Sequence, residues 1–249
     1  MKVDPAQTIN EKDVATSMAG KVFLITGAST GIGEATARHA AQAGYRLVLA
    51  ARSADKLKQL AADLGGRDRA IAIPCDVTEW KSQEAMVKAA LEQFGQIDVA
   101  FANAGILRGS RFLGGKDTPD EWREMVLTNV YAVAATARLV LPELIKRKGH
   151  LLLTGSVVGR VVAAPGSLYS PTKWAVTAMG ESIRQAVCGT GVRVTLIEPG
   201  MVDTPFWKES PTEPAIRAED VARAVMYAVN QPAAVSVNEL LVRPTDQKV

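Results

Sequence analysis

Short runs of consecutive apolar residues alternate along the chain with longer stretches in which apolar residues recur every three or four positions. Consecutive apolarity is typical of strands buried on both faces, and the longer repeat is typical of amphipathic helices. The predicted strands span residues 22–26, 46–50, 70–74, 97–101, 150–154, 192–197 and 239–242. The predicted helices span residues 32–43, 54–64, 81–94, 119–147, 168–187 and 218–230.

The regular alternation of strand and helix predicts an α/β fold, a doubly wound sheet of seven parallel strands flanked by helices. We expect one domain over residues 21–249, because no linker or repeat divides this stretch. Residues 1–20 contain no apolar core and precede the first strand, and we expect them to form an N-terminal tail. Sheets of this kind bind ligands beyond the carboxyl ends of their strands.

Composition excludes several classes of function. Hydrophobic residues make up 47% and charged residues 22% of the chain, as in ordinary globular proteins. The net charge of +3 is spread along the sequence, so nucleic-acid binding is not indicated. Cys75 and Cys188 lack metal-ligand spacing, and we expect reduced thiols and no metal site. The first twenty residues resemble neither a secretory signal nor a membrane span, so we expect a cytoplasmic protein that binds no membrane.

A glycine-rich turn joins the first strand to the first helix, in the sequence Thr-Gly-Ala-Ser-Thr-Gly-Ile-Gly from Thr26 to Gly33. Glycines here permit a tight turn and a close approach of the backbone to phosphate, and the helix N-terminus attracts the pyrophosphate of a dinucleotide. A glycine-rich turn without a ligand is the alternative. The predicted dinucleotide contacts are Gly27, Ser29, Thr30, Gly31, Ile32 and Gly33.

The end of the second strand indicates which dinucleotide is bound. Enzymes that use NAD usually place a carboxylate there, but this chain has Arg52, whose guanidinium suits the 2′-phosphate of NADP. A solvated arginine is the alternative. At the next two strand ends, Asp76 and Val77 are candidates for the adenine edge, and Asn103, Ala104 and Gly105 for the ribose. The same residue types also favour simple turns.

Tyr169 and Lys173 are four residues apart, on one face of a predicted helix, with Ser156 upstream. A tyrosine has an ordinary pKa of about 10, so roughly one in a thousand is ionised at pH 7. A nearby ammonium favours the phenolate and lowers that pKa. Beside a nucleotide site, the pair therefore predicts a device for proton transfer.

Taken together, these motifs resemble the short-chain dehydrogenase/reductase family, whose fold is a Rossmann-type sheet. The resemblance runs from Lys21 nearly to the C-terminus, and it departs from the family at Ala102, where a second asparagine is more usual, and after Gly200. The matching positions, in order, are Thr26, Gly27, Gly31, Gly33, Asp76, Asn103, Ala104, Gly105, Asn129, Ser156, Tyr169, Lys173, Pro199 and Gly200.

The resemblance implies an NADP(H)-dependent oxidoreductase that interconverts a carbonyl compound and an alcohol. Tyr169 would be the general acid/base, and Lys173 would lower its pKa and bind the nicotinamide ribose. Ser156 would hold the substrate oxygen, and Asn129 would hold a water in a proton relay. Pro199, Gly200, Val202 and Thr204 would fix the nicotinamide carboxamide. Relatives assemble as dimers or tetramers through the helices that carry Asn129 and Tyr169.

The substrate is less constrained. Relatives usually insert a helical lid after Thr204, whereas here a short proline-bearing segment carries Phe206 and Trp207, which predict an apolar rim. The alternative is that these two rings pack on the core or on another subunit. Leu107, Val157 and Leu168 are further candidates for the substrate pocket, and Arg160 is expected to be solvated. The end of the chain resembles dehydrogenases of small 3-hydroxy acids, but a broad ketone reductase, a 3-oxoacyl reductase and a non-catalytic NADP(H) sensor remain alternatives.

Overall fold

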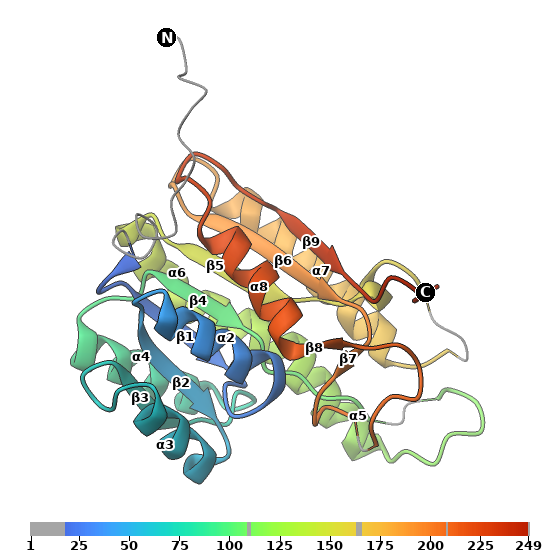
Figure 1. Ribbon diagram of the computed structural model, residues 1–249. Helices are drawn as coiled ribbons and strands as arrows, with labels where there is room; N and C mark the ends of the chain where they lie inside the picture. The colour runs from blue at the N-terminus through green and yellow to red at the C-terminus, as the bar shows by residue number, and fades with distance from the viewer. Residues whose placement is uncertain (1–17, 109–110, 163–165, 208, 249) are drawn as a thin grey trace.

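The computed structural model describes residues 18–108, 111–162, 166–207 and 209–248. Its central sheet contains seven strands, all parallel, in the order β3-β2-β1-β4-β5-β6-β9 (Figure 1). The strands are β1 (Val22–Thr26), β2 (Arg46–Ala51), β3 (Ala70–Pro74), β4 (Val99–Ala102), β5 (His150–Thr154), β6 (Arg193–Pro199) and β9 (Glu239–Val242). This confirms the predicted doubly wound, single-domain α/β fold, and every predicted strand lies within two residues of its observed bounds.

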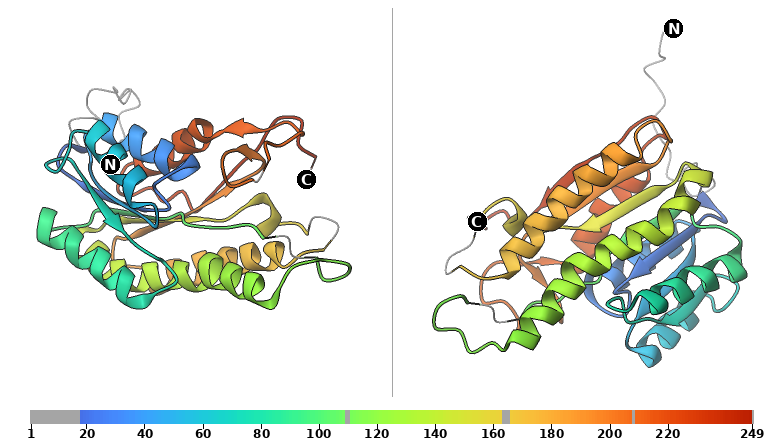
Figure 2. Two further views of the ribbon diagram at one scale, coloured as in Figure 1. Left: turned by 90° about the horizontal axis from the view of Figure 1, so that it is seen from below. Right: turned by 180° about the vertical axis from the view of Figure 1, so that it is seen from behind.

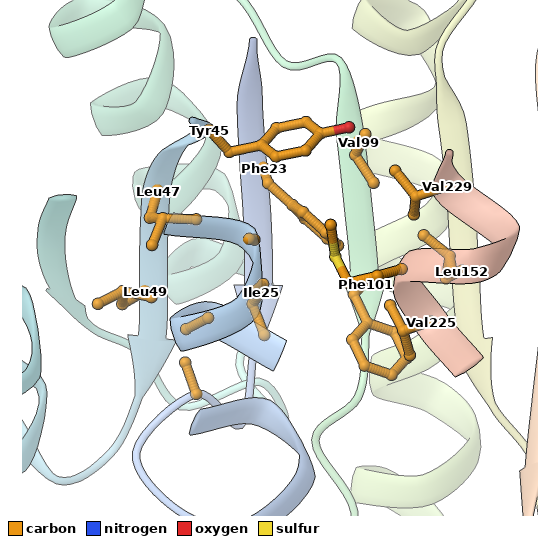
Figure 3. Packing of buried hydrophobic residues seen from close by; sticks show 14 of the residues in the cluster. Phe23, Ile25, Tyr45, Leu47, Leu49, Val99, Phe101, Leu152, Val225 and Val229 are labelled. Carbon is orange, nitrogen blue, oxygen red and sulfur yellow. The ribbon is translucent and has the colours of Figure 1, made fainter. Parts of the chain in front are cut away.

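Helices cover both faces of the sheet, which explains the continuous apolarity of the strands (Figure 2). On one face, α2 (Gly31–Gln42), α3 (Ala54–Asp63) and α8 (Ala218–Val229) pack over a buried cluster that includes Phe23, Leu49 and Phe101 (Figure 3). On the other face lie α4 (Trp80–Phe94), α6 (Ala132–Arg147) and α7 (Tyr169–Ala186). Met18, which we expected in the N-terminal tail, is buried in the first cluster and accepts a bond from the Tyr45 hydroxyl.

The predicted helix over residues 119–147 is interrupted. It consists of α5 (Pro119–Val126), a π-helical turn η1 (Leu127–Tyr131) and α6. Thr118 begins α5 with a capping box, and Pro119 follows in the first turn. This 29-residue run is long and apolar enough to pass a test for a membrane span, but half of its most apolar window is buried inside the protein, as in a core helix. The π-turn matters for function because it contains Asn129.

A short turn and a pair of two-residue strands complete the carboxyl edge of the sheet. A 3-10 turn, η2 (Val157–Gly159), follows β5, and β7 (Val202–Asp203) pairs in parallel with β8 (Ile216–Arg217) after β6. No helix forms in the described residues between β7 and β8, in keeping with the short segment expected there. All the predicted site motifs lie at or just beyond the carboxyl ends of the strands.

Candidate active site

The glycine-rich turn lies directly beyond β1 and leads into α2. Gly27 and Gly31 have φ angles of +65° and +57°, which favour glycine. A side chain on Gly33 would clash with the Gly27 carbonyl oxygen. The backbone of α2 can therefore lie this close to the turn only because residue 33 is a glycine. The side chain of Thr30, at the helix N-cap, makes no capping hydrogen bond. The first turn of α2 therefore keeps its amides free of a side-chain cap, as an anion site requires.

The turn is fastened to the ends of β4 and β5. Asn103 donates through its amide to the Thr26 carbonyl oxygen at 3.0 Å, and its own side-chain oxygen accepts from the Thr154 hydroxyl at 3.2 Å. The Thr26 hydroxyl accepts from the backbone N–H groups of Asn103 and Ala104. The Asn103 side chain thus holds the glycine turn in place, and the ribose role predicted for it would fall to the backbone of this segment.

Ser156 and Tyr169 come together from η2 and the start of α7. The Ser156 side chain lies close enough to the phenol to lower the pKa of Tyr169, and the Ser156 hydroxyl donates to the Pro199 carbonyl oxygen at 3.3 Å. Burial raises the pKa of Tyr169 above its ordinary value, and Ser156 opposes the rise only in part. The phenol is therefore protonated at neutral pH and is placed to act as a proton donor.

Lys173 is buried one helical turn after Tyr169, with its ammonium nitrogen 5.7 Å from the tyrosine ring centroid. That nitrogen donates to the Thr154 carbonyl oxygen at 2.9 Å, and burial lowers the pKa of Lys173 to about 8. The net pKa of Tyr169 is nevertheless raised, because burial of the phenol dominates, and a lowering of that pKa by Lys173 stays a prediction. Gly105 lies beside the amine, since a side chain there would be 3.8 Å from the lysine nitrogen.

Asn129 is buried and its side chain is fully engaged. It accepts from the backbone N–H of Ile106 at 2.8 Å and donates to the carbonyl oxygen of the same residue at 2.9 Å. It also donates to the Thr172 hydroxyl at 3.2 Å. The side chain therefore clamps the segment after β4 against α7, and its role of holding a water in a proton relay stays a prediction.

At the predicted adenine end, Arg52 lies beyond β2 with 62% of its side chain exposed. It makes one long ion pair, 3.5 Å, with Glu124, and Glu124 also pairs with Arg108 at 2.8 Å. Exposed pairs of this kind are weak and exchange readily for a better anion. Arg52 therefore remains available to a phosphate, although its pairing with Glu124 could not be predicted from the sequence.

Asp76 and Val77 make the turn after β3. Asp76 accepts from the Thr78 backbone N–H and hydroxyl at 2.9 and 2.7 Å. Burial raises the pKa of Asp76, but the Thr78 bonds and the charge of Arg52 outweigh it and hold the pKa below its ordinary value. The Val77 carbonyl oxygen accepts from Gln83. One Asp76 carboxylate oxygen is thus used to stabilise the turn, in line with the alternative that these residues only form a turn. A contact between Asp76 and adenine stays a prediction.

The predicted nicotinamide segment and apolar rim lie beside the predicted catalytic cluster of Ser156, Tyr169 and Lys173. Thr204 approaches the glycine turn, since a side chain on Gly31 would lie 3.2 Å from it. The Phe206 ring centroid is 6.0 Å from that of Tyr169, which places this ring at the site. Trp207 packs on Phe206 and donates to the Val202 carbonyl oxygen. Among the other candidates, Val157 is buried, whereas Leu107 and Leu168 are partly exposed.

The glycine turn, the Ser156–Tyr169–Lys173 cluster and Asn129 occupy one edge of a doubly wound sheet. The sequence model of the short chain dehydrogenase family matches residues 21–215. The chain belongs to the short-chain dehydrogenase family. An oxidoreductase of Staphylococcus haemolyticus is 37% identical over 232 residues, which cover 92% of this chain and 99% of the relative.

Two solved structures are similar over nearly the whole of this short-chain dehydrogenase. An alcohol dehydrogenase from the archaeon Thermococcus sibiricus, complexed with 5-hydroxy-NADP, is 35% identical with a TM-score of 0.85, and the match covers 92% of this chain and 98% of that one. A metagenomic short-chain oxidoreductase in complex with NADP is 31% identical with a TM-score of 0.78, covering 92% and 99%. The protein is thus an oxidoreductase with a site for a nicotinamide dinucleotide, and the uncapped helix and crowded glycines fit such a group.

A cavity of about 340 Å³ lies at the opposite, amino edge of the sheet, lined among others by Tyr45, Asp98 and His150. It contains none of the predicted site residues. The predicted site residues of this short-chain dehydrogenase lie instead at the carboxyl edge of the sheet.

Proposed function

We propose that this protein is an NADP(H)-dependent carbonyl reductase that interconverts a ketone or aldehyde and an alcohol. The observation that carries the proposal is the close pair of Ser156 and Tyr169 beside buried Lys173 and next to the glycine turn. A pure dinucleotide sensor has no need of this set, which argues against the non-catalytic alternative.

In reduction, NADPH held by the glycine turn and by Lys173 would supply a hydride to the carbonyl carbon. Tyr169 donates its phenolic proton to the carbonyl oxygen, and Ser156 orients that oxygen by hydrogen bonding. The raised pKa of Tyr169 keeps the proton in place until the substrate oxygen becomes basic. Lys173, held by Thr154, supplies positive charge that steadies the phenolate left behind. Alcohol oxidation runs these steps in reverse, with the phenolate as base.

The preference for NADP(H) rests on Arg52 and on the absence of a carboxylate at the end of β2. The apolar rings of Phe206 and Trp207 favour substrates with an apolar group beside the carbonyl. This weighs toward a broad ketone reductase rather than an enzyme for 3-hydroxy acids, because Arg108 and Arg160 are both committed to carboxylates within the protein.

A panel of ketones, aldehydes and 3-oxo acids, assayed with NADPH and with NADH, tests the proposal directly. We expect consumption of NADPH with at least one apolar ketone, and faster turnover with NADPH than with NADH. Tight NADPH binding without turnover on any carbonyl would instead support the sensor.

We also propose that the protein is a cytoplasmic homo-oligomer, a dimer or a tetramer. Exposed apolar side chains lie along the helical layer formed by α5, η1, α6 and α7, namely Val126, Tyr131, Ile145 and Trp174. A second copy of the chain would bury them. Sedimentation velocity gives the mass, and Tyr131→Lys should lower it if this layer is the interface.

A further inference from the structure

The chain doubles back after β9 and crosses the turn that follows β6. Residues 239–247, here called the C-terminal strap, begin with the edge strand β9 (Figure 1). The Val242 carbonyl oxygen accepts from the Gly200 N–H at 2.8 Å. The Gln247 side-chain oxygen accepts from the Met201 N–H, also at 2.8 Å. The strap thus takes up two successive backbone donors of the turn.

The shape of the strap explains why residue 200 has no side chain. A β-carbon on Gly200 would clash with the Gln247 side-chain oxygen and with the Cβ of Arg243. Pro244 is buried, and its carbonyl oxygen accepts from the Gln247 N–H, which closes a turn that brings Gln247 back over Met201. The strap and the turn after β6 therefore fit as two interlocked pieces of backbone.

The other end of the strap is linked to the turn formed by Ser156 and η2, here called the serine turn. Arg160, just after η2, donates to both carboxylate oxygens of buried Glu198, at 2.6 and 2.8 Å, and also pairs with Glu239. This corrects the expectation that Arg160 is solvated. A bidentate ion pair with a buried carboxylate fixes the relative position of the two side chains. Glu198 directly precedes Pro199, whose carbonyl oxygen accepts from Ser156, so strap, serine turn and the end of β6 form one unit.

We propose that the C-terminal strap sets the conformation of the turn formed by Pro199, Gly200 and Met201, so that the turn receives the nicotinamide end of the dinucleotide. Gln247 is a positioning residue in this arrangement, acting through the Met201 N–H. The inference rests on the proposed function, because it assigns the turn to the nicotinamide end of NADPH.

The test compares three variants of the full chain. Gln247→Leu keeps the size of the side chain but removes the acceptor, Gln247→Glu keeps an acceptor, and Asp246→Ala changes an exposed neighbour in the strap. Dissociation constants are measured for NADPH and for adenosine 2′,5′-bisphosphate, which lacks the nicotinamide. Because one hydrogen bond is lost, we expect Gln247→Leu to weaken NADPH binding about three- to tenfold. Binding of the bisphosphate and the kcat at saturating NADPH should change less than twofold.

The Glu variant should restore NADPH binding, and Asp246→Ala should resemble the parent. Equal NADPH affinity in the parent and in folded Gln247→Leu would overturn the inference, as would equal weakening of both ligands. Amide hydrogen exchange at Met201 reports the strap's hold on the turn without any ligand, and Gln247→Leu should accelerate it. A parent chain that binds neither ligand would contradict the proposed function instead. Unchanged hydrogen exchange at Met201 in Gln247→Leu would contradict the role of the strap in holding the turn.

Discussion

The side-chain nitrogen of Lys173 donates to the backbone carbonyl oxygen of Thr154 across 2.9 Å. The last residue of β5 thereby fixes an amine that is buried within α7. The same threonine bonds Asn103 through its hydroxyl, so one residue joins the predicted catalytic lysine to the segment that fastens the glycine turn. An ammonium in this position lowers the stability of the fold, because a buried charge is poorly solvated.

Lys173→Met should therefore stabilise the protein while abolishing turnover. Burial lowers the pKa of Lys173 from 10.5 to about 8. The folded state thus disfavours the charged amine below pH 8, and this destabilisation fades as the pH rises toward 10.5. At pH 7 we expect the free energy of unfolding to rise by about 1–2 kcal/mol, after the lost bond to Thr154 is deducted. Urea denaturation of the parent and the variant at pH 7 and pH 10 measures this change in the free energy of unfolding. A variant less stable than the parent at pH 7 would contradict the claim that the buried charge of Lys173 is destabilising.

The rate of carbonyl reduction should fall as the pH rises through about 8. Tyr169 stays protonated across this range because burial raises its pKa, whereas Lys173 loses its charge there. Without that charge, the phenolate formed on proton transfer is less well stabilised. The pH profile of kcat with saturating NADPH and ketone measures this limb. In Lys173→Arg, the fall in kcat should move above pH 10, measured on the activity that the variant retains. A fall that stays near pH 8 would show that a group other than Lys173 causes it.

The fold was predictable because its strands are apolar throughout and its helices are amphipathic. The interruption at η1 was not, because the sequence from Leu127 to Tyr131 has no proline or glycine to mark it. The π-turn accompanies the bonds of Asn129 to Ile106 and Thr172, which join positions far apart in the chain. Local sequence patterns carry no information on such contacts.

Arg52→Ala should weaken NADPH binding roughly tenfold or more and leave NADH binding within twofold. The guanidinium is the cation at the end of β2, and a charge-assisted bond to a phosphate contributes about 1.5–3 kcal/mol. Titration of protein fluorescence with each dinucleotide gives both constants. Glu124→Gln is the control: it removes the anion beside Arg52 and should leave NADPH binding equal or tighter. Equal affinities of the parent for NADPH and NADH would contradict this assignment.

Phe206→Ala should raise KM for aromatic ketones about three- to tenfold while changing kcat little. The ring lies 6.0 Å from Tyr169, and its removal takes apolar surface away from the substrate site. Steady-state kinetics on acetophenone-like and small aliphatic ketones would show the larger effect on the aromatic ones. Phe112→Ala serves as a matched control, because Phe112 packs on Trp122. The same loss in both variants would place the substrate elsewhere.

The site was predictable as far as its residues belong to short motifs. The glycine turn and the pair of Tyr169 and Lys173 can be recognised from spacing alone. The anchoring role of Thr154 could not be, because it acts through a backbone carbonyl group that every residue has. The ion pairs of Arg160 and of Arg52 were missed for another reason: each joins elements separated by many residues, and only the folded sheet brings the charges together.

The most direct measurement is the single-turnover rate of hydride transfer from NADPH to a ketone in the parent and in Tyr169→Phe. The variant removes only the phenolic hydroxyl, so NADPH affinity should stay within twofold while the rate falls at least 100-fold, as expected for loss of a general acid. The circular dichroism of both proteins checks the fold. A folded variant that keeps more than a tenth of the parent rate would contradict Tyr169 as the proton donor, and with it the proposed mechanism.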